Sequence, residues 1–200
     1  DRGQLQQVFL NIINNAFANK AIDKGADGLI AVAAGAGGHA GVKSPFALIQ
    51  EIREWFDGPL LLSGAMATGG GVLAAQAMGA DLAYIGSAFI ATQEARASDA
   101  YKQAIVEGTS DDIVYSSLFT GVHGNYLKAS IRNAGLDPDH LPESDPTKMN
   151  FSGGEGAKKA WKDIWGCGQG IGAVKAVLPA AALVDRLARE YGEARERLCA

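Results

Sequence analysis

Short runs of apolar residues recur along the first half of the chain, about 25 residues apart. Each run is nearly continuous in Val, Ile, Leu or Ala and is bounded by Gly, Asp or Asn. Strands covered by helices on both faces show such runs, because alternation of apolar and polar residues requires one face in water. The pattern therefore predicts buried strands of a parallel sheet over residues 8–13, 28–32, 59–63 and 82–85.

Helical patterns lie between these strands. The first covers residues 16–24 and stops at Gly25, the second begins with the capping pair Ser44 and Pro45, and the third covers residues 71–78. The phrases KGADGLIAV and MGADLAYIG both contain a helix end, a turn and a strand, which indicates repeated βα units. We therefore predict an α/β fold of the (β/α)8 TIM-barrel type, to which this sequence contributes about four βα units.

The pattern changes after the fourth strand. Residues 108–130 are mixed, and the stretch 135–156 is rich in Pro, Asp, Ser and Gly, which predicts a long surface excursion. Pro179 marks a break or a helix start within the last helical pattern. The helices expected in this half cover residues 89–107, 157–165 and 171–191.

This division predicts two parts of the chain. We expect residues 1–107 to form the C-terminal half of a barrel, and residues 108–200 to form an extension, loop-rich and then helical, that packs on it. A half-barrel leaves two strand edges unpaired. The sequence also opens almost directly in a strand. We therefore expect either an N-terminal half that is missing here or a partner chain that completes the barrel. A homo-oligomer would be one form of the second arrangement.

Composition excludes several classes of partner. The net charge of −4 gives no electrostatic reason to expect nucleic acid or an anionic membrane. No apolar run approaches the roughly 20 residues that span a bilayer, and the first residues lack the features of a signal peptide. The two cysteines, without CxxC or Cys/His spacing, predict neither a disulfide framework nor a metal site. A cytoplasmic location is therefore expected.

A glycine-rich loop, GAGGHAG, follows the second predicted strand and precedes a helix. In a (β/α) barrel the active site lies on such loops, so His39 is expected to project into the barrel mouth as the catalytic side chain. An imidazole exchanges protons at neutral pH, and Gly37 and Gly38 let a flat ring system approach the backbone. The alternative is that His39 caps the following helix or satisfies a loop carbonyl.

Two further strand ends carry turns made of small residues, in LLLSGAMATGGG and ADLAYIGSAF. Phosphate binding at the last strands of a barrel uses backbone N–H groups, and the side chains there must be small because the anion lies against the main chain. The alternative is that both are ordinary βα turns. The residues that meet the requirement are Ser63, Gly64, Ala65, Gly86 and Ser87.

At these residues the sequence resembles the nitronate monooxygenase family, formerly called 2-nitropropane dioxygenases. The matching segments are GGHAG at 37–41, PLLLSGA at 59–65 and MGADLAYIGSAFIATQEA at 78–95. The resemblance implies an FMN-binding barrel with no metal, in which backbone at Ala65, Gly86 and Ser87 holds the flavin phosphate. It also implies that Gly37 and Gly38 lie near the isoalloxazine and that His39 is the active-site histidine.

The function that this resemblance implies is oxidation of alkyl nitronates with oxygen to a carbonyl compound and nitrite. Related families leave open an NAD(P)H-dependent flavin oxidoreductase that reduces a quinone or an enoyl thioester. The count of four strands leaves open a non-catalytic barrel fragment that needs a partner chain. Position 65 is Ala where the family often has Gly, and position 88 is Ala where Arg is frequent. The amide of Ala65 can still bind phosphate unless the backbone there requires a positive φ.

Overall fold

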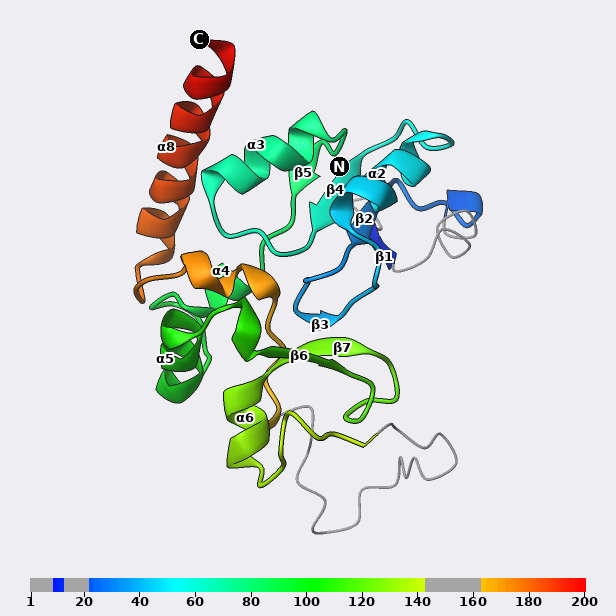
Figure 1. Cartoon of the computed structure of the whole chain (residues 1–200). Helices are drawn as coiled ribbons and strands as arrows, with labels where there is room; N and C mark the ends of the chain where they lie inside the picture. The colour runs from blue at the N-terminus through cyan, green and yellow to red at the C-terminus, as the bar shows by residue number, and fades with distance from the viewer. Residues whose placement is uncertain (1–8, 13–21, 143–162) are drawn as a thin grey trace, which may run out of the picture.

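A four-stranded parallel sheet forms the first half of the molecule (Figure 1). The computed structural model describes residues 9–12, 22–142 and 163–200. The strands lie side by side in chain order, and each pairs in parallel with the next, which confirms the four strands predicted from the apolar runs. They are β1 (Phe9–Ile12), β2 (Gly28–Val32), β4 (Leu60–Ser63) and β5 (Leu82–Ala83).

Two helices, α2 (Pro45–Arg53) and α3 (Gly69–Ala77), cover one face of this sheet (Figure 1). Ser44 caps α2, as predicted, because its hydroxyl accepts a hydrogen bond from the amide of Ala47 at 3.3 Å. Thr68 caps α3 through the amide of Gly71 at 3.1 Å, so that this helix begins two residues before the predicted start. The buried core between helices and sheet contains Leu48, Ile49 and Ile52 with Leu29, Ala31, Leu60 and Leu62. Full burial stabilises each large side chain by about 1.5–3 kcal/mol.

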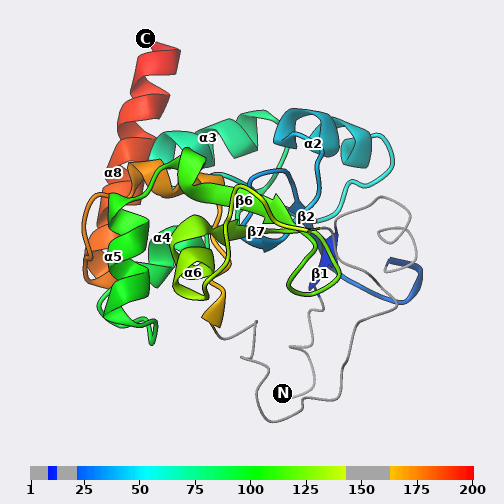
Figure 2. The same cartoon turned by 60° about the horizontal axis from the view of Figure 1, so that its bottom comes forward.

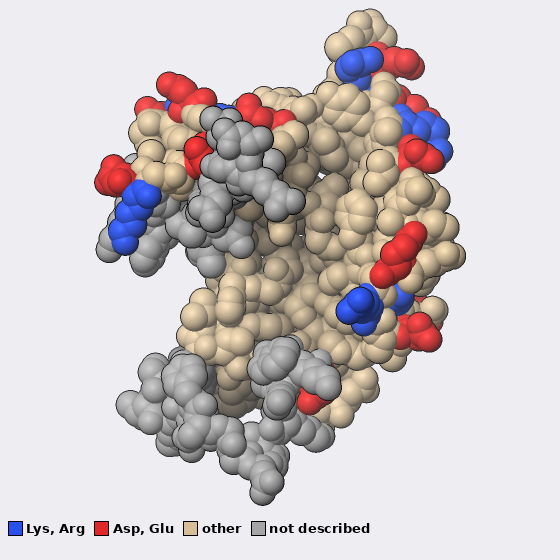
Figure 3. Space-filling model, turned by 180° about the vertical axis from the view of Figure 1, so that it is seen from behind, with Lys and Arg blue, Asp and Glu red and all other residues tan. Residues whose placement is uncertain are grey.

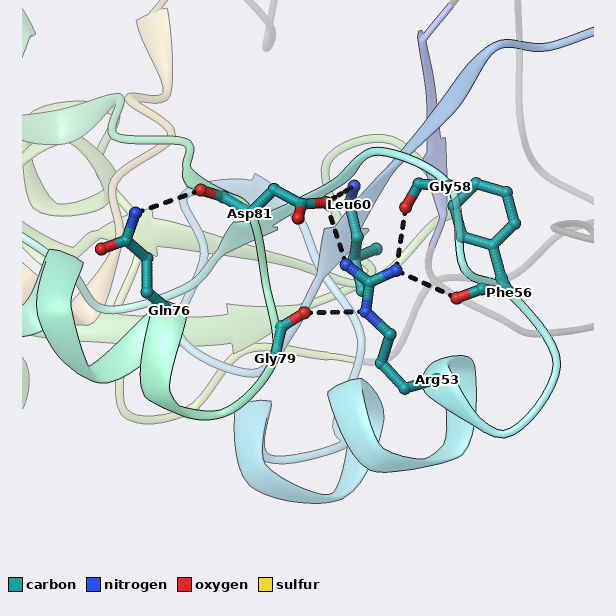
Figure 4. A network of polar contacts seen from close by, with 7 residues as sticks. All are labelled: Arg53, Phe56, Gly58, Leu60, Gln76, Gly79 and Asp81. Carbon is teal, nitrogen blue, oxygen red and sulfur yellow. Dashed lines mark hydrogen bonds and ion pairs between the residues drawn. The ribbon is translucent and has the colours of Figure 1, made fainter.

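A polar network around Arg53 fixes the end of α2 against the turns that enter β4 and β5 (Figure 4). Asp81, from the repeated Gly-Ala-Asp phrase, accepts from the amide of Leu60 at 2.7 Å and pairs with Arg53. These two contacts, that of the Leu60 amide first, lower the pKa of the Asp81 carboxyl. The Arg53 guanidinium donates to the carbonyls of Gly79 (2.7 Å), Gly58 (2.8 Å) and Phe56 (3.0 Å) and to Asp81 (2.9 Å).

The prediction of one helix over residues 89–107 is wrong. The chain forms the short helix α4 (Ser87–Ile90) and, after a break, α5 (Asp99–Glu107). The break arises because the segment between them pairs with the C-terminal part of the chain: Thr92 forms a bridge with Leu178, and the amide of Gln93 donates to the Leu178 carbonyl at 2.9 Å. Ser98 then caps α5.

The prediction of one helix over residues 171–191 is also wrong. A 3-10 turn, η3 (Gln169–Ala173), is followed by an extended segment and then by α8 (Ala180–Cys199). Pro179 stands at the N-cap of α8, which confirms the helix-start alternative for this residue. Most of the helix expected over 16–24, of the excursion over 135–156 and of the helix over 157–165 lies outside the described residues.

A β-hairpin lies within the residues that sequence analysis left as mixed. It consists of β6 (Ile113–Ser116), preceded by η1 (Ser110–Asp112), and β7 (Gly124–Leu127), followed by α6 (Lys128–Asn133). The short strand β3 (Gly38–His39) pairs with β7, so the glycine-rich loop joins a second, antiparallel sheet. Figures 1 and 2 show this hairpin on the side of the parallel sheet opposite α2 and α3.

The C-terminal helix α8 packs closely on the beginning of α3. The amide of Gly69 donates to the carboxylate of Glu190 at 2.9 Å, and Tyr191 donates from its hydroxyl to Gln76 at 2.7 Å. A Cβ at Gly69 would lie 2.1 Å from the carbonyl oxygen of Leu187, so only glycine permits this contact. Residues from both predicted parts share the core beneath, among them Ala67, Ala88, Ile105, Leu127, Cys167, Ile171 and Leu183. The division of the chain at residue 107 stays a prediction.

Substitution of Gly69 by Ala should destabilise the protein, because the added methyl group meets α8 backbone atoms that cannot yield without separating the helices. We expect a loss of at least about 2 kcal/mol, in the upper range for overpacking. Gly70→Ala is the matched control, since its Cβ would make an ordinary 3.8 Å contact, and its stability should be unchanged or higher by up to about 1 kcal/mol. Urea unfolding of both variants measures the difference, and equal stabilities would contradict the close contact.

Candidate functional site

A cavity of about 230 Å³ lies at the carboxyl ends of β2, β4 and β5. No charged side chain is among the described residues that line it. Figure 3 shows a face whose tan part bears charged side chains near its margins and none in its hollowed middle. The structure brings together in this cavity all the residues that the sequence predicts for cofactor binding: Gly37, Gly38, Ser63, Gly64, Ala65, Gly86 and Ser87.

The turn after β4 departs from the sequence expectation at Ala65. The backbone of this residue is left-handed, with a φ of 52. Alanine is unfavourable in this conformation, because its Cβ is crowded against the backbone. Its amide also donates to the Gly35 carbonyl at 3.2 Å and is therefore already engaged. The preceding residue, Gly64, has φ 154 and lies close to the Ala34 carbonyl, where a Cβ would be only 3.0 Å away.

The turn after β5 is the more open part of the cavity. Within the described part of the chain, the amides of Gly86 and Ser87 donate no hydrogen bond. A Cβ at Gly86 would meet nothing within 4 Å, because this position faces empty space. The Ser87 hydroxyl accepts from the amide of Gly168 at 2.9 Å, which ties this turn to the C-terminal part of the chain. The two amides are available to an anion as individual donors.

The glycine-rich segment GCGQGIG, residues 166–172, forms the remaining wall. Its residues Gly166, Gly168 and Gly170 line the cavity. A Cβ at Gly168 would lie 2.6 Å from the carbonyl oxygen of Gly35, and one at Gly170 would lie 2.7 Å from the carbonyl carbon of Ala65. The glycines are therefore required by close backbone approach between loops. Their clustering is the sequence signal from which a close approach of backbones in this segment could have been predicted.

Partly buried aromatic side chains contact this wall. Tyr101 donates from its hydroxyl to the Gly166 carbonyl at 2.5 Å and stacks on Trp165, with ring centroids 4.7 Å apart. Burial raises the pKa of both the Tyr101 phenol and the Cys167 thiol, the latter to about 11. Cys167 is therefore a protonated packing residue at neutral pH, since nucleophilic cysteines are thiolates.

His39 lies beside the cavity, on β3, directly after Gly38, which lines it. The imidazole is exposed, and its Nε2 lies 2.8 Å from the hydroxyl oxygen of Thr120. The alternative in which His39 caps the next helix is wrong, because Ser44 caps α2. Sequence analysis did not identify Thr120, which comes from the unpredicted hairpin.

Two kinds of feature are absent from the described ranges. There, no three His, Cys, Asp or Glu side chains gather closely enough to hold a metal ion. None of the helices described combines the length and apolar character that crossing a bilayer requires.

Comparison with known families shows to which family this chain belongs. The model of the family described as nitronate monooxygenase matches residues 6–190, which include both turns, the glycine-rich loop and the C-terminal wall. The chain belongs to the nitronate monooxygenase family. Its members are flavin-dependent oxidoreductases.

Two curated relatives have similar sequence identities to the chain. A nitronate monooxygenase from Paraburkholderia phytofirmans is 29% identical over 189 residues, which cover 87% of this chain and 51% of the relative. A putative monooxygenase from Mycobacterium tuberculosis is 29% identical over 180 residues, which cover 84% of this chain and 48% of the relative. The chain therefore spans about half the length of the curated relatives that it matches.

Solved structures confirm the fold class. A nitroalkane oxidase from Streptomyces ansochromogenes is 28% identical, with a TM-score of 0.76 over 95% of this chain and 58% of that one. FabK from Thermotoga maritima is 22% identical, with a TM-score of 0.73 over 96% of this chain and 63% of that one, a likeness that concerns the fold alone. The sequential parallel sheet of this family member is thus of the (β/α)8 TIM-barrel type.

The left-handed backbone at Ala65 predicts that Ala65→Gly stabilises this family member. Relief of strain of roughly 1–2 kcal/mol outweighs the greater entropy of glycine in the unfolded chain, for a net gain of about 0.5–1 kcal/mol. Ala67→Gly is the control in the same turn: its φ is not positive and its methyl is buried, so it should destabilise. Thermal unfolding checks both, and a lower Tm for Ala65→Gly would contradict the strain.

Proposed function

We propose that this chain carries the flavin-phosphate cradle and the proton-handling histidine of an FMN-dependent enzyme that oxidises alkyl nitronates with oxygen. The observation that carries the proposal is the convergence of three separate small-residue segments on one uncharged cavity beside His39. The sequence predicts each of these segments separately as a turn or loop that a ligand can approach closely. The nitronate family supports the reaction class.

The fit of a flavin phosphate rests on the turn after β5. The amides of Gly86 and Ser87 donate no hydrogen bond within the described residues, and space is open above Gly86. Backbone amides bind phosphate without a cationic side chain when the main chain is accessible. The amide of Ala65, by contrast, would have to exchange its bond to Gly35 for one to phosphate. We therefore assign the main anion contacts to Gly86 and Ser87.

The chemistry then divides between the cofactor and the chain. Bound FMN would accept electrons from the nitronate and pass them to oxygen, with a carbonyl compound and nitrite as products. The glycines Gly37 and Gly38 would leave the face of the ring system free of side chains. His39, which follows them directly, would orient the nitronate and exchange protons with it.

FMN binding tests the cradle. The protein should bind FMN more tightly than riboflavin, which lacks the phosphate, and Gly86→Ala should weaken FMN binding about 10-fold or more, the value of one charge-assisted hydrogen bond. The added methyl fills the cradle without strain, since φ at Gly86 is −109 and no atom obstructs it. Gly192→Ala on α8, equally open, is the control. Quenching of flavin fluorescence measures each dissociation constant.

Either of two results would contradict the cradle. Equal affinities for FMN and riboflavin would mean that the phosphate makes no contact here. Absence of flavin binding at any concentration would mean that this chain requires another to complete the site, as in the partner-chain alternative.

Nitrite release tests the reaction and the role of His39. With a nitronate and oxygen, the FMN-loaded protein should release nitrite, and His39→Ala should lower kcat by about 10²–10⁴-fold, the usual share of general acid–base catalysis. His140→Ala is the control, because that exposed side chain pairs with Asp137 in the C-terminal part. Flavin-dependent oxidation of NAD(P)H with a quinone, without nitrite from nitronates, would instead support the reductase alternative.

A further inference from the structure

His39 is held by the hairpin that sequence analysis did not predict. β3, which carries His39, pairs with β7, and the turn between β6 and β7 places the Thr120 hydroxyl oxygen 2.8 Å from the imidazole Nε2. The hydroxyl of Tyr115 on β6 donates to the Ala40 carbonyl at 2.9 Å, one residue beyond His39. Backbone and side chain of the histidine are thus both fixed by one hairpin.

The contacts of Thr120 determine the direction of this hydrogen bond. Its Oγ1 lies 3.0 Å from the carbonyl oxygen of Val122, and a carbonyl only accepts. The single hydroxyl proton is therefore used on Val122. The Thr120 oxygen must then accept at its other contacts, of which His39 Nε2 is the shortest. In the neutral imidazole the proton lies on Nε2, and the lone pair remains on Nδ1.

We propose that Thr120 is a positioning residue, which holds the His39 ring with the proton on Nε2 and presents Nδ1 as the nitrogen that exchanges protons with the substrate. The consequence for turnover rests on the proposed function, whereas the protonation pattern does not. The neighbouring side chains maintain this arrangement: Tyr126 is buried, its hydroxyl lies 3.4 Å from Thr120 Oγ1, and its ring meets Phe119 edge-on.

The contact between Thr120 and His39 differs from an ordinary contact within a loop, because its loss would affect the imidazole as well as the turn. A threonine that only closes the turn would bond to Val122 and leave the histidine free to rotate. Here the same oxygen joins the turn and the ring, so loss of the hydroxyl should release the ring without removing the strand pairing that holds its backbone. Positioned catalytic groups lose activity when their orientation is freed, even where binding is intact.

The test compares Thr120→Val, which keeps the shape, with Thr120→Ser, which keeps the hydroxyl. The chain has three histidines, so nitrogen-15 NMR resolves each imidazole, and His39→Gln assigns the signal of interest. We expect a proton on Nε2 of His39 that exchanges slowly with solvent in the wild type and in Thr120→Ser but rapidly in Thr120→Val. Slow exchange of this proton decides the question, because a free imidazole already favours the tautomer with the proton on Nε2. The position of the proton alone would therefore not show that Thr120 holds the ring.

In the nitronate assay, Thr120→Val should lower kcat about 10-fold with an unchanged FMN dissociation constant, and Thr120→Ser should restore it. A proton on Nδ1 in the wild type would overturn the proposal, as would a Thr120→Val protein with slow exchange and full kcat. If the wild type releases no nitrite, the proposed function fails, and the NMR measurement still decides the protonation pattern.

Discussion

A single carbonyl oxygen, that of Gly35, holds the site together. It accepts hydrogen bonds from the amides of Ala65 at 3.2 Å and of Gln169 at 2.9 Å. The loop after β2, the turn after β4 and the C-terminal segment therefore meet at one atom. Such an approach leaves no room for Cβ atoms, which explains glycine at position 168, and Ala65 at the same junction has a left-handed backbone. The cavity exists because these three backbones touch.

The C-terminal helix reinforces the same junction from outside. Arg186 on α8 donates to the carbonyl of Ala67 at 2.9 Å and to that of Ala173 at 3.4 Å, so it spans the turn after β4 and the end of η3. Glu190, one helical turn later, binds the amide of Gly69 at the start of α3. Residues from the end of the chain thus fix the conformation of turns that lie more than 100 residues earlier, and the cavity depends on both parts of the sequence.

Sequence patterns predicted the strands and the cavity-lining turns because these depend on local composition: buried parallel strands are continuously apolar, and close backbone approach requires small residues. The break in the helix expected over residues 89–107 could not be predicted in this way. It results from pairing of Thr92 with Leu178, a contact between residues far apart in sequence. The hairpin was missed for a related reason, since its strands are short and include Gly124 and Asn125, which β-propensity disfavours. Thr120 therefore could not be predicted from the sequence as a partner of His39.

The proposed anion contacts and the proposed proton-exchanging histidine lie on different sheets. The turns with Gly86 and Ala65 end strands of the parallel sheet, whereas His39 belongs to the antiparallel one. Residues 33–37 connect β2 with β3, and the buried Asn125 amide donates to the Ala36 carbonyl at 2.7 Å within that connection. Because Asn125 lies on β7, the hairpin sets the position of the histidine relative to the cavity. Changes in the hairpin should therefore alter the orientation of His39, and β7 also bonds to the C-terminal wall of the cavity, because the amide of Cys167 donates to the Asn125 carbonyl at 3.1 Å.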